Sequence, residues 1–494
     1  MILALTYIVD TIEAKNANVV EKAWFRNNAF VNNPAANFQI SADSLMYIKS
    51  GYLKSFADHN MMLVEEGSSF ESFYIQSTSF KREGSMFYFG KASYESSKNR
   101  NTTWSNVENH QLLGPYIIAD SVGGDYLREK YAIEGGVSKK HENIEWGIRA
   151  IYNGVVAYRQ IDPRPRNTVS ELSIQPGINF RKNNFGWGFS PLYHRYRQAV
   201  EIHVEKEKKL IYIYSAKGLG QYHWQLSDFY SSYSRSYRAE TYAAATQMYW
   251  NKNRSATIIQ LKNSHTPLKV IESDERIPFQ TKTYNHTLEV SHEQTLGRKT
   301  LFFDLELAFQ QKIGRETQFN SIQINNIPNI WVPISESDRY LQTFEKAGLS
   351  MLITNTLQPN NTMWQRIALT FTENKEQYFE PDVKQLISRL SLDATWGVNS
   401  TVRKNNRDYA LRIQYLPVLT SVYDNYSNST FAKAYNEYNF NVLSKTIYAV
   451  GINAIYNFNI NKSLSVSLTA NIDYYFDENK NSKLITDTNI SFYF

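Results

Sequence analysis

The chain has 494 residues, of which 42% are hydrophobic and 20% are charged, and its net charge is +6. No apolar run approaches the roughly 20 residues of a membrane-spanning helix, which excludes a helical membrane protein but not a transmembrane β-barrel. No basic run is long enough to indicate nucleic-acid binding. Cysteine is absent, which excludes disulfides, thiolate metal ligands and cysteine nucleophiles.

The first 42 residues precede any strand-like pattern. Residues 1–10 begin with the apolar run "MILALTYIV", which lacks the positive residues that open a secretory signal, so they are a signal remnant or a first segment. Residues 23–38, "AWFRNNAFVNNPAANF", are aromatic and Asn-rich and contain a proline. We therefore expect residues 1–42 to form a plug-like segment, separate from a second unit that comprises residues 43–494.

From residue 43 onward, apolar and polar residues alternate along many segments. In "SLSVSLTANIDYYF" (463–476) every second residue from Leu464 to Phe476 is apolar. A period of two with one apolar face predicts a half-buried strand. The segments exceed the roughly 5–6 residues typical of soluble strands and suit a tilted crossing of a bilayer. They predict about eighteen strands, with sixteen as the alternative count, at 43–55, 69–80, 85–96, 128–138, 143–158, 168–180, 185–195, 236–250, 254–264, 281–294, 299–310, 340–355, 362–372, 384–400, 408–417, 443–458, 463–476 and 484–494.

The connections between these strands fall into two classes. Short polar clusters of turn formers, such as "KREGS" (81–85) and "QPNN" (358–361), follow about every second strand. The others are long and variable, at 97–127, 196–235, 265–280, 312–338 and 418–441. Short turns on one side and long loops on the other are typical of an outer-membrane barrel. The sequence therefore predicts an all-β fold, a transmembrane antiparallel β-barrel with long extracellular loops. A soluble β-sandwich or β-helix is the alternative.

Aromatic side chains near the strand ends are expected to form the girdles that anchor such a barrel at the two membrane interfaces. They are Tyr88, Phe89, Tyr94, Trp146, Tyr158, Trp187, Tyr249, Trp250, Trp364, Trp396, Tyr456, Phe458, Tyr474 and Phe476.

Charged residues on the polar faces of the strands are expected to point into the lumen. Such charges either tune a water-filled channel or hold an occluding segment by salt bridges, and a barrel of this size is wide enough for an aqueous pore unless something fills it. We expect partial filling. The lumen-facing candidates for ligand binding are Arg149, Asp304, Glu306, Arg366, Arg389, Asp393, Arg412 and Asp473, and Glu145 faces the same way.

The long loops interleave aromatic residues with Ser, Asn and Arg, a composition typical of adaptable recognition surfaces. Tyr222, His223 and Trp224 in "GLGQYHWQLSDFYSSYSRSYR" and Trp331 in "NNIPNIWVPISESDR" are the loop candidates for binding a sugar, a haem-like ligand or a protein. Ordinary packing of the loops on one another explains most of their residues equally well.

An enzymatic function finds little support in the sequence. An outer-membrane hydrolase needs a Ser–His–acid set or an Asp–His pair, and the nine His are scattered along the chain. No H-E-x-x-H, G-x-S-x-G or phosphate-binding loop is present. We expect no catalytic residues, no metal site and no cofactor.

The chain ends in "NISFYF", in which Ile490, Phe492 and Phe494 share one face. This end is similar to the C-terminal strand that the barrel-assembly machinery reads. Together with "VVEKAWFRNNAFVNNPAANFQIS" (19–41), it resembles an uncharacterised family of Bacteroidota outer-membrane barrels whose genes often lie beside TonB-dependent receptors and surface lipoproteins.

The resemblance implies an outer-membrane protein with an accessory role in nutrient or iron uptake, alongside a TonB-dependent receptor or a surface lipoprotein. Outer-membrane lipids, lipopolysaccharide and the assembly machinery are further expected partners, the last through Phe494. The alternatives are a stand-alone porin or FadL-like diffusion channel and, more remotely, an outer-membrane enzyme.

Overall fold

The computed structural model describes residues 33–39, 43–206, 209–322, 330–358, 360–402, 405–424, 429–461 and 464–494. The first half of the wall comprises β1 (Ser44–Ala57), β2 (Ser69–Glu83), β3 (Met86–Thr102), β5 (Gly124–His141), β6 (Ile144–Arg159), β7 (Arg164–Lys182), β8 (Phe185–His203), β12 (Ser232–Lys252), β13 (Ser255–Glu272) and β14 (Phe279–Leu296). The second half comprises β15 (Lys299–Ile322), β16 (Ile330–Gln358), β17 (Asn361–Phe379), β18 (Asp382–Val402), β19 (Asn405–Leu416), β20 (Val418–Asp424), β21 (Ile447–Asn459), β22 (Ser465–Asp477) and β23 (Ser482–Tyr493).

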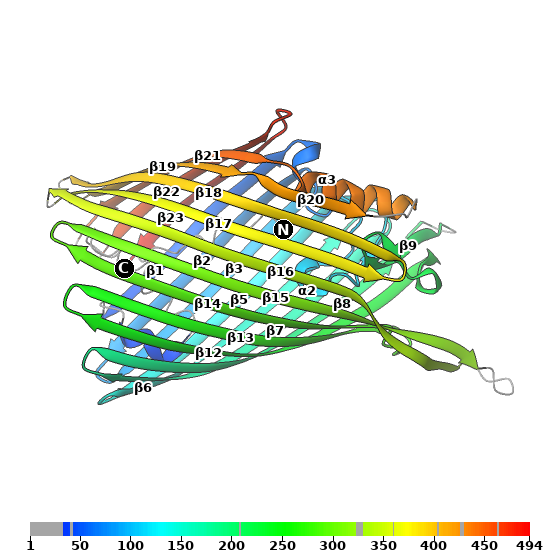
Figure 1. The fold of residues 1–494 in the computed structure, drawn as a ribbon, viewed down its shortest axis with the longest axis horizontal. Coiled ribbons are helices and arrows are strands. Elements are labelled where there is room, and N and C mark those ends of the chain that lie inside the picture. Colours follow the sequence, from blue (N-terminus) through cyan, green and yellow to red (C-terminus); the bar gives the residue numbers. More distant parts are fainter. Residues whose placement is uncertain are drawn as a thin grey trace.

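These strands form a closed antiparallel barrel of 18 staves, a stave being one complete crossing of the wall. The barrel is closed because β23 pairs with β1, and every other stave pairs with the staves before and after it along the chain (Figure 1). Strands β19 and β20 make one stave, and Pro417 separates them. On the N-terminal side of Pro417, β19 pairs with β18 and β21. On its C-terminal side, β20 pairs with β18. Proline has no N–H to donate to a ladder, which explains a break at this point.

The predicted alternation is confirmed, and each of the eighteen predicted segments coincides with one stave. The predicted strands were too short at the long-loop end. For example, β15 continues to Ile322, twelve residues beyond the predicted end at 310, and four predicted long loops (97–127, 196–235, 265–280 and 312–338) begin and end as strand. The alternation of apolar and polar residues weakens there, because some outward side chains of this extension, such as Arg315, are polar.

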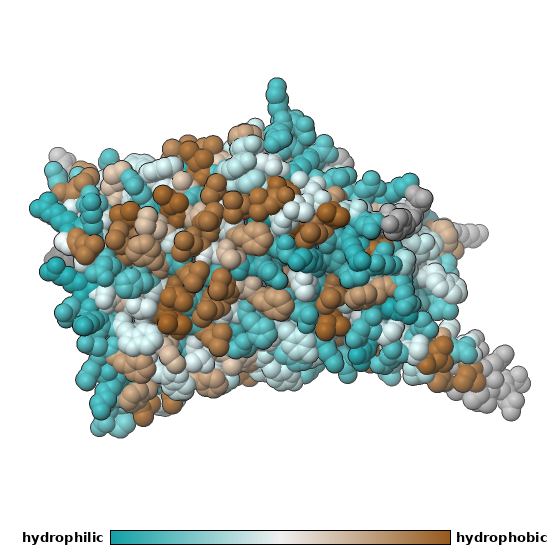
Figure 2. Space-filling model, viewed as in Figure 1, coloured by the Kyte–Doolittle hydropathy of each residue, from teal (hydrophilic) through white to brown (hydrophobic). Residues whose placement is uncertain are grey.

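The outer face of the wall is apolar. Outward positions alternate with inward ones, as where exposed Leu305 and Leu307 flank inward Glu306. Figure 2 shows apolar residues gathered over the wall between two more hydrophilic ends. Three of the predicted girdle residues face the lumen instead: Tyr249 is buried against Gly186, Trp364 packs on Gly397, and Phe89 packs on Gly136. Each of these glycines leaves room for the aromatic ring of a neighbouring strand to point inward. The alternation along a single strand does not reveal such a glycine, so the sequence pattern predicted the wrong face for these three rings.

The short 3-10 helix η1 (Pro34–Gln39) lies inside the barrel against β5, β6, β7 and β8. Three inward glycines on adjacent strands, Gly147, Gly177 and Gly188, form a shelf: a Cβ atom on each would come within 3 Å of Asn33 or Pro34. Asn33 Nδ2 donates to Ile178 O over 3.1 Å. Residues 33–39 thus lie in the lumen, whereas the rest of the predicted plug (1–42), including residues 1–10, lies outside the described residues.

Candidate functional site

A polar band lines the inner wall, and all eight predicted lumen residues lie on inward faces. On the β17–β22 side, Asp393 Oδ2 accepts hydrogen bonds from Arg412 Nε and from Gln414 Nε2, both over 2.6 Å. Arg412 is level with Gly451 and Asp473 on the next two staves. A Cβ atom at Gly451 would lie 2.2 Å from the Asp473 carboxylate, so the glycine makes room for that side chain.

The other predicted lumen charges are also engaged by neighbouring strands. Lys346 Nζ lies 2.7 Å from Glu306 Oε2, and Asp304 accepts from the Ser291 hydroxyl over 2.6 Å. Arg149 donates to Gln175 over 2.6 Å. Among the described residues, Arg366 Nε is buried with no hydrogen-bond partner. The structure therefore confirms the inward placement, while a role of these residues in ligand binding stays a prediction.

The long-loop end of the barrel is filled by a layer that the sequence did not reveal. We call it the lid: residues 58–68, 103–123, 204–231 and 429–446, as far as they are described. It contains η2 (His59–Met61), α2 (His110–Leu113), β4 (Ile118–Ala119), β9 (Ile211–Gly218), β10 (Gln221–Tyr222), η3 (Trp224–Leu226), β11 (Asp228–Tyr230), η4 (Ala432–Glu437) and α3 (Tyr438–Leu443). Strands β4, β10 and β11 all pair with β9, so part of the lid is a small sheet of its own.

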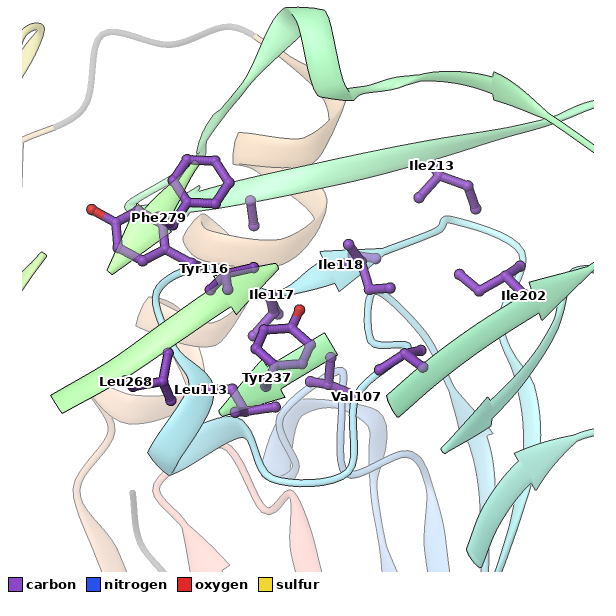
Figure 3. Close-up of a cluster of buried hydrophobic side chains, with 14 of the residues drawn as sticks. Val107, Leu113, Tyr116, Ile117, Ile118, Ile202, Ile213, Tyr237, Leu268 and Phe279 are labelled. Carbon is purple, nitrogen blue, oxygen red and sulfur yellow. The ribbon is translucent and has the colours of Figure 1, made fainter. Parts of the chain in front are cut away.

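The lid and the inner wall share one hydrophobic core (Figure 3). The ring of Tyr116, from the lid, stacks on that of Phe279, from β14, with centroids 4.5 Å apart and planes inclined by 9°. Ile118 and Ile213, from paired lid strands, belong to the same core, and so does Tyr237 from β12. Burial of apolar surface at roughly 25 cal/mol per Å² makes such a core a strong attachment for a loop layer.

Polar contacts also tie the lid to the wall around the barrel. Arg159, on β6, forms an ion pair with Asp120 of the lid at 2.7 Å, and both side chains have 0% exposure. Arg235, on β12, donates to Ser215 Oγ over 2.7 Å, and Lys217 of the lid lies 2.8 Å from Glu316 of β15.

Backbone carbonyls of the lid are bound in the same way. Lys312 Nζ, on β15, donates to Gln111 O and Gly114 O over 2.7 and 2.9 Å. Arg389, on β18 and predicted as a ligand residue, donates instead to Leu443 O and Lys445 O over 2.7 and 3.0 Å. Arg389 thus fixes the C-terminal end of α3.

The four loop candidates separate into two groups. Tyr222 packs against Tyr214 and Phe431 inside the lid, and the His223 ring meets Phe279 edge-on. Trp224, by contrast, is 75% exposed. Trp331 lies far along the β15–β16 hairpin, where the Arg276 guanidinium is 4.4 Å from its ring centroid.

Burial controls the titration of two lid histidines. Burial, followed by the nearby cations Lys217, Arg235 and Arg276, lowers the pKa of His223 to about 4. Burial also lowers the pKa of His110 to about 4, although Glu66 opposes this. Both imidazoles are therefore neutral at neutral pH.

His110 Nε2 contacts Ser105 Oγ, which raises the question of a hydrolytic pair. Ser105 is buried, and its hydroxyl also bonds to the Val107 backbone, as in an ordinary turn. Within the described ranges no carboxylate hydrogen-bonds to the His110 ring, as the acid of a Ser–His–acid triad would. The contact fits a turn that holds the lid core.

In the part of the chain that the structure covers, no three His, Cys, Asp or Glu side chains are placed to hold a metal ion. None of its helices is long and apolar enough to cross a membrane.

Residues 34–494 match the model of the family of unknown function DUF6850, so the chain belongs to this family. No protein of curated function matches the chain.

The fold resembles solved outer-membrane receptors and transporters. The ferric preacinetobactin receptor BauA from Acinetobacter baumannii shares 9% identity over 92% of this chain and 80% of its own, with a TM-score of 0.42. The outer membrane transporter YddB from Escherichia coli shares 7% over 90% and 80%, with a TM-score of 0.41. The copper transporter OprC shares 7% over 91% and 80%, with a TM-score of 0.42.

Proposed function

We propose that the chain is an outer-membrane barrel that serves as a partner subunit in nutrient or iron uptake, beside a TonB-dependent receptor or a surface lipoprotein. The proposal follows the resemblance of residues 19–41 and of the chain end to barrels whose genes accompany such proteins. In this arrangement the short turns face the periplasm and the lid and the long loops face outward.

The observation that carries the proposal is a hairpin that extends beyond the barrel rim (Figure 1). The last pair of β14 with β15 is Phe279–Glu316, and the first pair of β16 with β17 is Tyr340–Tyr378. Beyond these pairs, residues 318–322 and 330–335 have only each other as strand partners among the described residues. We call this two-stranded segment the arm.

The arm has the surface of a docking element. Ile334 is 62% exposed, and Ile322 and Trp331 are exposed as well. A two-stranded ribbon alone is marginally stable in water, and its open edges are templates for another strand. A partner protein that covers these apolar side chains and pairs with an edge would stabilise the arm. This supports a subunit that works in contact with another protein.

The second candidate, a stand-alone diffusion channel, is less consistent with the lid. A passive pore needs a continuous wet path, whereas the described part of the lid packs a hydrophobic core and buried ion pairs across the long-loop end. Planar-bilayer recordings separate the two functions. A steady large conductance from the intact chain would favour the channel, and a quiet bilayer agrees with the partner role.

The direct test is affinity purification of the tagged chain from its native membrane in mild detergent, followed by mass spectrometry. The test variant is Ile322→Asp with Ile334→Asp, and the matched control is Leu210→Asp on the lid, where the side chain is 55% exposed. A stoichiometric receptor or lipoprotein that the arm variant loses and the control keeps would support the proposal. Purification of the chain alone would contradict the partner role, and a complex unaffected by the arm variant would contradict the arm as its binding surface.

A further inference from the structure

A second surface feature lies at the long-loop end of the barrel, where the lid meets the β22–β23 turn. Between η2, α3 and the β22–β23 turn there is an open cavity of about 430 Å³. Four asparagines line it, together with one tyrosine, one valine and one lysine; we call it the asparagine cup. The residues are Asn60, Asn441, Asn479, Asn481, Tyr438, Val442 and Lys445.

The cup is built by Asp477, which organises the turn behind it. Asp477 Oδ1 accepts from the backbone N–H groups of Asn479 and Asn481, both over 2.9 Å, and Oδ2 accepts from Asn481 Nδ2 over 2.8 Å. Lys445 Nζ lies 3.1 Å from Asp477 Oδ2 and donates to Asn60 O over 2.8 Å. One ion pair thus fixes two walls of the cup relative to each other.

The same ion pair makes the cup a poor site for an anion. The only cation among its lining residues is Lys445, which is already neutralised by Asp477. What remains is a set of neutral amides beside an aromatic ring. Among the described residues, the side-chain amides of Asn441 and Asn479 have no hydrogen-bond partner, so both are available to a ligand.

Each amide carries a donor N–H and an acceptor oxygen side by side. Pairs of hydroxyl groups, which also donate and accept, complement this arrangement, and sugars present such pairs around each ring. The volume lies within the roughly 300–1,000 Å³ of small-molecule sites. The chemistry of the cup therefore suits a mono- or disaccharide.

The floor of the cup argues against a ligand with a long apolar tail. Val442 separates the cup from a mostly apolar cavity of about 50 Å³, lined by residues that include Met61, Leu63 and Ile485. This space holds a few water-sized groups and not an acyl chain. The cup therefore suits a compact ligand that is recognised mainly by its hydroxyl groups.

We propose that the asparagine cup binds a saccharide through the amides of Asn441 and Asn479. The sugar comes either from free oligosaccharides outside the cell or from the lipopolysaccharide that surrounds the barrel. Both sources present the same hydroxyl chemistry to the cup.

The test uses the purified full-length chain in detergent, exposed to an array of free mono- and oligosaccharides and, separately, to lipopolysaccharide micelles. Asn441→Ala with Asn479→Ala should weaken saccharide binding about tenfold or more, because two hydrogen bonds are lost. Asn441→Trp, which fills the cup, should abolish it. The matched control is Asn360→Ala, in the turn between β16 and β17 at the short-turn end of the barrel. This variant should bind the saccharide as the native chain does.

Binding to array sugars that both cup variants lose would support a free saccharide as the ligand. Binding to lipopolysaccharide alone, lost in the same variants, would support the cup and assign the sugar to the membrane. Binding to neither probe, or binding that the variants keep, would overturn the proposal. Each variant is checked for its folded electrophoretic mobility, so that a folding defect is not mistaken for loss of the site.

Discussion

Arg159 and Asp120 form an ion pair across the boundary between wall and lid, 2.7 Å apart and with 0% exposure on both sides. Arg159 also donates to Pro163 O, and Asp120 accepts from Val122 N, while Arg159 Nη1 is buried without a partner among the described residues. Loss of one partner of such a pair costs roughly 3–5 kcal/mol, because the other charge stays buried and unpaired.

Arg159→Met is therefore expected to release the lid locally while the barrel stays folded. Hydrogen exchange at Asn106 N, which donates to Ile118 O inside the lid, should accelerate by about two orders of magnitude or more. Arg100→Met, which breaks the exposed pair with Glu71, is the control and should change little. Adding Asp120→Leu to Arg159→Met should restore part of the protection; failure of the single variant to accelerate exchange would show that the hydrophobic core alone holds the lid.

A second prediction concerns the glycine shelf under residues 33–39. In Gly177→Ala the new Cβ atom would lie 2.2 Å from Asn33 Oδ1, the atom that accepts from Ala35 N. Overpacking of this kind costs about 1–3 kcal/mol, so amide exchange at Ala35 should be roughly tenfold faster. Gly90→Ala, whose Cβ would meet Glu134 O at an ordinary 3.7 Å, serves as control. Unchanged exchange at Ala35 in Gly177→Ala would mean that the segment is not seated on the shelf.

The sequence predicted the wall far better than the lid, and the reason is physical. A strand that crosses a bilayer must alternate, because one face meets lipid and the other meets the lumen, and this constraint is local. Ile117, Ile118 and Tyr116 lie in "GPYIIADSV" (114–122), an apolar run inside a predicted loop, and that run was the available signal. Their partners, such as Phe279, are more than 150 residues away, so no local pattern identifies them.

The same distinction applies to the candidate site residues. Arg389 was recognised as inward-facing from its neighbours, but its partners are carbonyls at and just after the C-terminal end of α3, more than fifty residues later. Asp120 and Arg159 gave no sequence signal, since a charge in a loop and a charge at a strand end are both expected in water.

The lid is expected to weaken in mildly acidic solution through His223. Its pKa is about 4 in the packed lid, because of burial and nearby cations, and near the ordinary value of about 6.5 once released. The released state therefore binds a proton between pH 6.5 and 4, and stability contributed by His223 is complete above that window and lost as pH falls through it. Burial raises the pKa of Glu66 and Glu108, which acts in the opposite direction.

The contribution of His223 is isolated by comparison with His223→Gln. A nitroxide attached at Trp224→Cys labels a single position, because the chain has no other cysteine. Its spectrum reports lid mobility from pH 7.5 to 4.5. The pH-dependent rise in mobility should be smaller in the glutamine variant than with His223 present. Identical profiles would assign any acid response to other groups.

The charged side chains of the polar band either stabilise the wall or bind a ligand, and substitution of Asp393 distinguishes these two roles. Its carboxylate accepts from Arg412, Gln414 and Thr395, so it joins adjacent staves. Asp393→Asn keeps the size but removes the charge and should lower the free energy of unfolding by about 1–3 kcal/mol, measured by urea titration in lipid vesicles.

The matched control is Asp382→Asn, which disturbs the exposed pair with Lys384 and should leave the unfolding midpoint in place. A double-mutant cycle with Arg412→Gln should give a coupling energy of about 0.5–3 kcal/mol if the pair itself stabilises the wall. An Asp393→Asn protein as stable as the native chain would instead mean that these hydrogen bonds are dispensable for the fold. That outcome would favour the sequence-based prediction that this lumen-facing carboxylate binds a ligand.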